Sequence, residues 1–200
     1  MSDRRIPAVS PWPVLLVALV AAFACRPSGA EVAVGQPAPD FALQDLDGKQ
    51  VKLADLRGKL VVLEWMNPNC PFSRGHAEKM TMVLTAAKHP DVVWLGINST
   101  RVGHDDFVAP ADYKTYDAQH GIAYTVLYDT SGAVGHAYGA RTTPHMFVVD
   151  REGNIAYQGA IDDGPSGATT NYVDQALSAL EAGRSPNPST TKPYGCSVKY

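Results

Sequence analysis

The sequence predicts an α/β domain in which helices flank a central sheet with strands of mixed direction. Two apolar runs, at 60–65 and 92–98, alternate with helical patterns, as parallel strands joined by crossover helices do. Turn residues at 47–48 and 151–154 each separate two short strand-like segments, which is typical of antiparallel hairpins. A chain of 200 residues with 45% hydrophobic and 18% charged side chains suffices for one such domain with extensions at its ends.

The first 30 residues have the pattern of a secretory signal. Two arginines precede an apolar run at 14–24, which is shorter than the roughly 20 residues that cross a bilayer, and small residues follow it. Cleavage after residue 24 or residue 30, lipidation of Cys25 and retention of the run as a membrane anchor are the alternatives. Ala22 stands where a bacterial lipobox usually carries Leu, so the lipoprotein is the less favoured one. We expect an exported protein, periplasmic or extracellular, with no membrane span in its mature form.

The mature chain begins with a predicted hairpin of strands at 41–43 and 51–53. The apolar run at 60–65 follows as a strand covered on both faces. Pro71 suits the first turn of a helix, and apolar residues continue at helical spacing to Ala87, just before His89-Pro90.

The second half continues the alternation of strands and helices. We expect strands at 92–98 and 125–128 and helices at 111–120 and 133–138, then a hairpin of strands at 146–149 and 155–157. An amphipathic helix at 172–181 ends at Gly183. The predicted domain therefore covers 31–183, and a tail rich in Pro, Ser and Thr covers 184–200.

Charge and cysteine content exclude several classes of protein. The net charge is −3, and losing the first 30 residues with three arginines and one aspartate changes it to −5. Without surplus positive charge we expect no nucleic-acid partner. Three cysteines are too few for a disulfide scaffold or a thiolate zinc cage, and no cofactor is expected. Two of them, Cys70 and Cys196, remain in the mature chain.

Cys70 lies between a buried strand and a helix that begins at Pro71. Unpaired amides at a helix N-terminus favour thiolate over thiol and so lower the pKa of a cysteine. Arg74 and His76 in the next turn are expected to add to this effect, and Ser73 to hydrogen bond the thiolate. The flanking Asn-Pro-Asn and Pro71 predict an exposed loop, so Cys70 is a candidate nucleophile rather than a small buried apolar residue.

Three motifs resemble the thioredoxin superfamily, in particular exported redoxins of the alkyl hydroperoxide reductase and thiol-specific antioxidant type. They span about 31–183 and are specific in combination. They are the strand at 61–65 followed by Cys70-Pro71-Phe72-Ser73, the segment Thr142-Thr143-Pro144 before a strand, and Gly35-Gln36-Pro37-Ala38-Pro39-Asp40-Phe41. The resemblance implies a thioredoxin-like fold with an N-terminal hairpin extension and a C-terminal tail.

The resemblance also implies a cis Pro144 that faces Cys70, with Thr143 offering its backbone to an extended substrate. Pro71 and Ser73 complete the expected substrate-binding set. The chain departs from the family in two ways. Ser73 replaces the second cysteine of C-x-x-C, and the P-x-x-x-T-x-x-C pattern of peroxiredoxins is absent, with Leu63 and Asn67 at its first two fixed positions. The peroxide-activating pocket is therefore not reproduced residue by residue.

These features predict a thiol-based oxidoreductase with Cys70 as nucleophile. Its substrate is a peroxide or a protein disulfide, and an external thiol supplies electrons. Cys196 is a candidate to resolve oxidised Cys70 by forming a disulfide, with a permanent tail disulfide or a free thiol as alternatives. From a different class, Cys70, His76 and His145 form a mixed N/S set for copper or zinc in a binding module without turnover. His145 alone is more typical of a packed residue than of a ligand.

Glu64 and the pair Asp162-Asp163 carry less weight. A carboxylate at the end of a strand is usually solvated, although Glu64 is also a candidate proton shuttle for Cys70. Asp162 and Asp163 precede Gly164-Pro165 and suggest turn and cap chemistry.

Overall fold

The computed structural model describes residues 32–164 and 167–200. The predicted signal, its cleavage sites and Cys25 lie outside the described residues. The main sheet has the strand order β2-β1-β5-β4-β3-β7-β8, and β6 and β9 form a separate two-stranded sheet. The strands are β1 (Ala42–Asp45), β2 (Gln50–Lys52), β3 (Val61–Trp65), β4 (Val93–Asn98), β5 (Thr125–Tyr128), β6 (Thr142–Thr143), β7 (His145–Val149), β8 (Ile155–Gly159) and β9 (Cys196–Ser197).

Strand directions confirm the predicted mixed sheet. β3, β4 and β5 run parallel to one another, whereas β1 is antiparallel to β2 and β5, and β7 is antiparallel to β3 and β8. Both predicted hairpins are therefore present. The parallel centre explains why β3 and β4 are mostly apolar and buried on both faces, since helices or loops cover each side.

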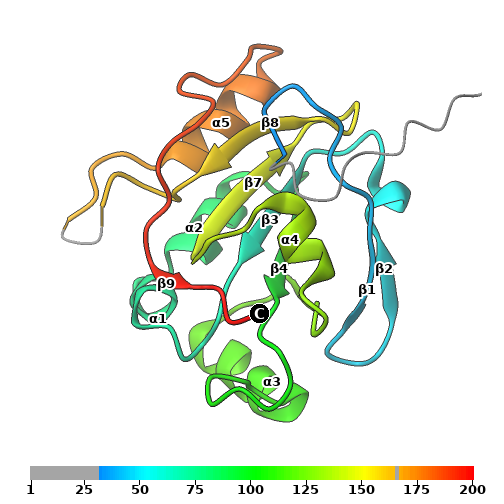
Figure 1. Cartoon of the computed structure of the whole chain (residues 1–200). Helices are drawn as coiled ribbons and strands as arrows, with labels where there is room; N and C mark the ends of the chain where they lie inside the picture. Colours follow the sequence, from blue (N-terminus) through cyan, green and yellow to red (C-terminus); the bar gives the residue numbers. More distant parts are fainter. Residues whose placement is uncertain (1–31, 165–166) are drawn as a thin grey trace, which may run out of the picture.

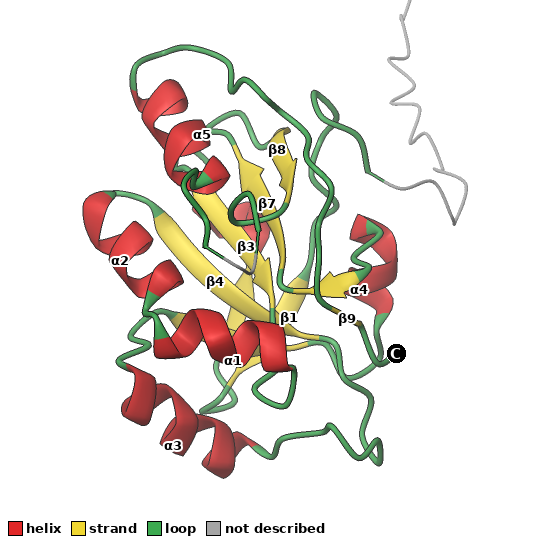
Figure 2. Cartoon of the chain, turned by 90° about the vertical axis from the view of Figure 1, so that its left-hand side faces the viewer, coloured by secondary structure: helices red, strands yellow, loops and turns green. Residues whose placement is uncertain are grey.

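Helices cover both faces of the sheet (Figure 1; Figure 2). One face packs on α2, α3 and α5 through two clusters that include Met82, Tyr113 and Leu177. The other face packs on α4 and the N-terminal segment through Tyr138 and Phe41. The helices are α1 (Pro71–Glu78), α2 (Thr81–Lys88), α3 (Pro110–His120), α4 (Ala133–Tyr138) and α5 (Tyr172–Glu181), with a short 3-10 helix at Leu53–Leu56.

The expectation of a single helix after Pro71 is wrong. α1 ends at Glu78, and Met80 adopts a left-handed φ of 55° before α2 begins. No glycine or proline marks this break, so the apolar spacing alone does not reveal it. The break places the Thr81 hydroxyl 3.2 Å from His76 Nδ1 and so gives the buried ring a partner.

The tail after α5 packs along the domain although it has no apolar periodicity. It first joins the free edge of β8. The Gln158 amide in β8 donates to the Ser189 carbonyl of the tail, and the Thr191 amide of the tail donates to the Gln158 carbonyl. It then passes α1 as β9 and ends beside α4 (Figure 1). Residues 184–200 therefore add a strand next to the N-terminus of α1.

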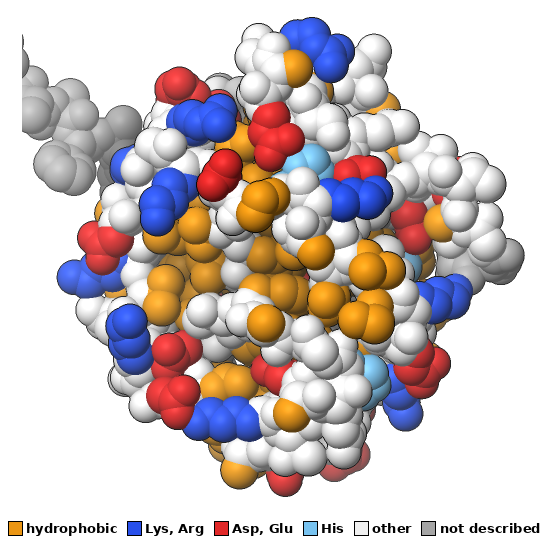
Figure 3. Space-filling model, turned by 180° about the vertical axis from the view of Figure 1, so that it is seen from behind, with side chains coloured by type: hydrophobic (Ala, Val, Ile, Leu, Met, Phe, Trp, Pro, Cys, Tyr) orange, Lys and Arg blue, Asp and Glu red, His pale blue; other side chains and the backbone are white. Residues whose placement is uncertain are grey.

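The surface mixes both signs of charge. On the face opposite to that in Figure 1, basic and acidic side chains are interspersed around a central group of hydrophobic ones (Figure 3). Across residues 32–164 and 167–200, every helix is too short or too polar to cross a membrane.

Candidate active site

Cys70 occupies the N-cap position of α1, directly before Pro71. The loop that leads to it is fixed by Asn67, whose side-chain oxygen accepts from the Asn69 amide at 2.7 Å and whose amide group donates to the Thr100 hydroxyl at 2.7 Å. The strand β3 and the helix α1 thus hold the thiol between them. This is the position that the sequence predicts for it.

The peptide bond between Thr143 and Pro144 is cis, as the resemblance implies. β6 ends at Thr143, and the carbonyl oxygen of this residue accepts a hydrogen bond from the Cys70 thiol at 2.9 Å. The two segments predicted to meet do so, although 73 positions separate Cys70 from Thr143 in the chain.

Cys196 joins the same site from the tail. β9 pairs antiparallel with β6, and the register places Cys196 opposite Thr143. The two cysteines line one cavity, each side chain shifts the pKa of the other, and both are free thiols. The structure therefore brings together the predicted nucleophile and its predicted resolving partner.

The two thiols differ in acidity. Burial raises the pKa of Cys70, but hydrogen bonds from the side chains of Cys196 and Thr143 and from the amides of Ser73 and Cys196 outweigh it, so the pKa lies below its ordinary value. For Cys196, burial and the neighbouring Cys70 raise the pKa to about 11. Cys70 is the thiol that ionises first and is the better nucleophile near neutral pH.

The residues in the next turn of α1 that were expected to stabilise the Cys70 thiolate have other roles in the structure. Ser73 contributes its backbone amide, whereas its buried hydroxyl has no hydrogen-bond partner. Neither Arg74 nor His76 is among the main causes of the lowered pKa of Cys70. The Nε2 atom of His76 instead lies 2.9 Å from the Tyr194 hydroxyl, and its Nδ1 atom is hydrogen bonded to Thr81. The ring therefore contacts the tail and α2.

The expectation of an exposed Cys70 is also wrong. The residue is only 5% exposed, because β6 and β9 lie over the start of α1. Access is through a cavity of about 150 Å³ that both cysteines line. Asn67, Asp106 and Lys199 are among the other residues around it.

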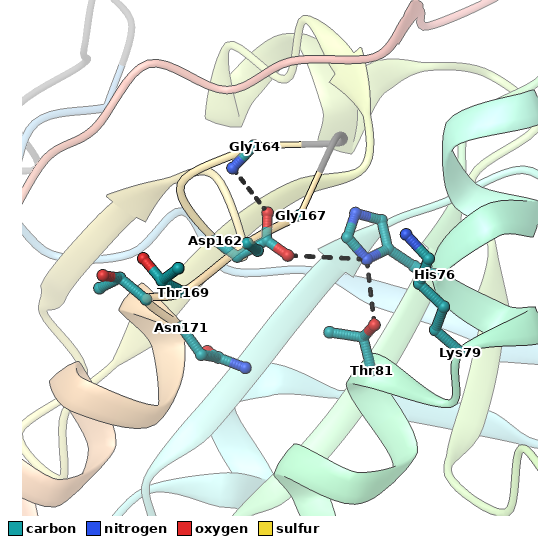
Figure 4. Close-up of a pocket in the computed structure, with 10 residues that line it drawn as sticks. His76, Lys79, Thr81, Asp162, Gly164, Gly167, Thr169 and Asn171 are labelled. Atoms are coloured by element: carbon teal, nitrogen blue, oxygen red, sulfur yellow. Dashed lines mark hydrogen bonds and ion pairs between the residues drawn. The ribbon is translucent and has the colours of Figure 1, made fainter.

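The buried Asp162 is more than a turn residue. One of its carboxylate oxygens accepts from the Tyr194 hydroxyl, and the other lies 4.0 Å from His76 Nδ1. Figure 4 shows Asp162 and His76 pointing toward each other across a second cavity, of about 340 Å³. Desolvation lowers the pKa of His76, so the ring is neutral near pH 7. The three side chains anchor the tail two residues before Cys196.

The copper or zinc set is not assembled. His145 is buried and accepts a hydrogen bond from the Arg141 amide at 3.2 Å, and burial lowers its pKa to about 3. His76 is engaged by Thr81 and Tyr194. Within residues 32–164 and 167–200, no group of three His, Cys, Asp or Glu side chains is placed to hold a metal ion.

Glu64 is buried, contrary to the expectation of a solvated carboxylate. Its side chain accepts hydrogen bonds from Trp94 Nε1 and the Tyr124 hydroxyl, both at 2.9 Å. Burial raises its pKa to about 7. A cavity of about 10 Å³ lies between Glu64, Ser73 and His76. The signal in the sequence is that Glu64 interrupts a strand whose other residues are all apolar.

The sequence profile of the AhpC/TSA family matches residues 34–158, which is more than half of the chain and includes Cys70 and Pro144. The chain belongs to the AhpC/TSA family. The match ends before the tail, so Cys196 lies outside the part of this AhpC/TSA protein that the profile covers.

Relatives and solved structures agree with this assignment. The thiol-disulfide oxidoreductase ResA of Geobacillus thermodenitrificans is 29% identical over 124 residues, which are 62% of this chain and 67% of ResA. An uncharacterized conserved protein from Geobacillus kaustophilus has a TM-score of 0.75 and 28% identity, covering 86% of this chain and 94% of its own.

A secreted Mycobacterium tuberculosis disulfide oxidoreductase homologous to E. coli DsbE has a TM-score of 0.54 and 24% identity, covering 72% of this chain and 95% of its own. This likeness and the mixed seven-stranded sheet confirm the thioredoxin-like fold. The family match and the ResA relatives support general thiol redox activity for this AhpC/TSA protein.

Proposed function

We propose that the protein is a thiol-dependent oxidoreductase in which Cys70 reacts with an oxidant and Cys196 resolves the product. The observation that carries this proposal is the contact between the two thiols, of which Cys70 has the lowered pKa and Cys196 the raised one. A thiolate beside a protonated thiol is the arrangement that attack followed by resolution requires.

The reaction balances with either expected oxidant. A hydroperoxide transfers its distal oxygen to the Cys70 thiolate and leaves as an alcohol after protonation. The Cys196 thiol then attacks the sulfenic acid, which releases water and forms the Cys70–Cys196 disulfide. With a disulfide, Cys70 displaces one thiol to form a mixed disulfide, and Cys196 displaces the other. In each case two cysteines lose two electrons, and two thiols of an external donor restore them.

Neighbouring residues stabilise the reacting sulfur. The Ser73 amide and the Thr143 side chain favour the thiolate, while the Thr143 carbonyl accepts from the protonated thiol. Pro71 begins α1 with a residue that has no amide hydrogen to leave unpaired. Thr143 and cis Pro144 form the opposite wall, so substrate contacts these residues and Cys70 together.

The proposed setting is outside the cytosol. The signal pattern in residues 1–30 supports it, because an exported chain meets oxidants and thiol donors in a compartment where cysteines cycle. Trypsin mapping of secreted protein would identify the mature N-terminus. Recovery of an intact N-terminus from the cytosolic fraction alone would contradict export.

The test compares wild type with Cys70→Ser and Cys196→Ser in two assays. One follows consumption of hydrogen peroxide with dithiothreitol as donor, and the other follows reduction of 2-hydroxyethyl disulfide with the same donor. We expect Cys70→Ser to lose activity in any assay in which wild type turns over. Full activity of Cys70→Ser would refute the mechanism.

Peptide mapping without reductant tests the resolving role. After one equivalent of oxidant, wild type should yield a peptide pair joined by Cys70 and Cys196. Cys196→Ser should instead retain a sulfenic acid or a mixed disulfide on Cys70, with both adducts identified by mass. Recovery of free Cys196 from fully oxidised wild type would remove it from the mechanism.

A further inference from the structure

The backbone edge beside Cys70 is occupied by the protein's own tail. Thr142 lies opposite Ser197 and Thr143 opposite Cys196, and the Val198 amide extends the contact by donating to the Arg141 carbonyl at 3.1 Å. An extended polypeptide that adds to a strand edge uses these same backbone groups. The tail therefore lies where a polypeptide substrate would have to pair with Thr143.

The approach of the tail to β6 is close enough to require glycine. A β-carbon at position 195 would lie 2.1 Å from the Thr143 carbonyl oxygen, and Gly195 has a φ of +139°. Residues with a β-carbon rarely adopt this backbone conformation. Gly195 thus allows the backbone next to Cys196 to lie directly on Thr143.

Two tyrosines hold the tail on either side of Cys196. Tyr194 hydrogen bonds Asp162 and His76, the pair shown in Figure 4, and its ring packs edge-on against Phe72. Tyr200 stacks on His136 with ring centroids 3.9 Å apart.

The residues around Tyr200 fit its side chain closely. Its hydroxyl donates to the Ala140 carbonyl at 2.6 Å, and a β-carbon at Gly135 would lie 2.5 Å from its ring. The tail is therefore anchored by side-chain contacts that do not depend on a disulfide, since both cysteines are free.

The space left at the sulfurs is small. The cavity lined by Cys70 and Cys196 has a volume of about 150 Å³, below the roughly 300–1,000 Å³ of pockets that hold drug-sized ligands. It accommodates a molecule of a few non-hydrogen atoms. An extended peptide has no free strand edge to join at Thr143 while β9 is in place.

We propose that residues 194–200 act as a specificity strand, which admits small oxidants to Cys70 and excludes extended polypeptide disulfides. This inference rests on the proposed function of Cys70. The excluded step is ordinary exchange, in which the Cys70 thiolate forms a bond to one sulfur of a disulfide and the other sulfur leaves as a thiolate. The tail changes which disulfides reach the thiolate and leaves the chemistry of that step unaltered.

The experiment measures this single step in the full-length chain with Cys196→Ser, so that mixed disulfides on Cys70 accumulate. One probe is 2-hydroxyethyl disulfide. The other is a linear heptapeptide whose central cysteine carries the same mercaptoethanol group. The test variant adds Gly195→Ala, which displaces the tail from Thr143, and the control adds Gly167→Ala. Gly167 has a similar φ of +131° with nothing within 4 Å of an added β-carbon.

We expect Cys196→Ser and its Gly167→Ala control to react with the small disulfide and poorly with the peptide. Gly195→Ala should raise the peptide-to-small rate ratio by roughly tenfold, a factor equivalent to about 1.4 kcal/mol. Tyr200→Ala in the same background removes the distal anchor and should change the ratio in the same direction if Gly195→Ala does not fold. Equal ratios in all folded variants would overturn the specificity strand. Failure of Cys70 to react with either probe would instead refute the proposed function.

Discussion

Thr143 and Cys196 lie opposite each other in the antiparallel pair of β6 and β9. The carbonyl of Thr143 also accepts from the Cys70 thiol at 2.9 Å, so one residue joins Cys70 to the tail. The tail therefore sets both the electrostatic surroundings of Cys70 and its accessibility.

The hydrogen bond from Cys196 should be measurable in the ionisation of Cys70. Because this bond lowers the pKa of Cys70, Cys196→Ala should move the midpoint of Cys70 alkylation by iodoacetamide to higher pH. Cys196→Ser keeps a hydroxyl donor and is the matched control, with a midpoint closer to wild type. Identical midpoints for the Ala and Ser variants would show that the side chain at position 196 does not stabilise the thiolate.

Glu64 should make the protein less stable as the pH rises. Its pKa is raised from 4.5 to about 7, so between these values the folded state binds more protons than the unfolded state and the free energy of unfolding falls with pH. Glu64→Gln should remove up to about 3 kcal/mol of the loss between pH 5 and pH 8 in urea denaturation.

Asp117 provides the control for Glu64, because burial also raises its pKa to about 7. Asp117→Asn should remove part of the same pH dependence and also lower the pKa of Glu64, because the charge of Asp117 helps to raise it. The double variant should lose both contributions. An unchanged slope in Glu64→Gln would mean that Glu64 ionises normally despite its burial.

Tyr194→Phe should loosen the tail while keeping the ring contact with Phe72. The variant loses the hydrogen bonds to His76 and Asp162 and leaves both buried groups short of a partner, which costs about 1–3 kcal/mol in the free energy of unfolding. Alkylation of Cys196 should become faster than in wild type. Tyr200→Phe loses only the bond to Ala140 and should have a smaller effect. A larger effect of Tyr200→Phe would contradict the role of Asp162 and His76 as the main anchor.

The donor thiol should attack Cys196 when it reduces the Cys70–Cys196 disulfide of the proposed cycle. Cys196 is partly exposed while Cys70 is buried, and Cys70 has the lower pKa and so leaves more readily. Brief treatment of oxidised protein with glutathione, followed by acid quenching, should give a glutathione adduct on Cys196 by mass mapping. An adduct found first on Cys70 would reverse this assignment.

Much of the fold follows from local patterns in the sequence. Apolar runs, turn residues and helix caps predict most elements, including α5 at its observed bounds. The break between α1 and α2 is missed because Met80, a residue with no special turn preference, adopts the left-handed conformation. The burial of Cys70 and Glu64 is missed for a related reason, since each depends on segments that pack over it from elsewhere in the chain.

The position of Cys70 at the N-terminus of a helix follows from local sequence, because a buried strand followed by Pro71 is a local signal. The residues that lie against that thiol are brought there by long-range packing. Strand pairing between β6 and β9 uses backbone groups that nearly every residue carries, so no sequence pattern in 184–200 predicts it. The anchoring of Tyr194 on Asp162 and His76 likewise needs three distant segments to meet, and it places Cys196 at the site.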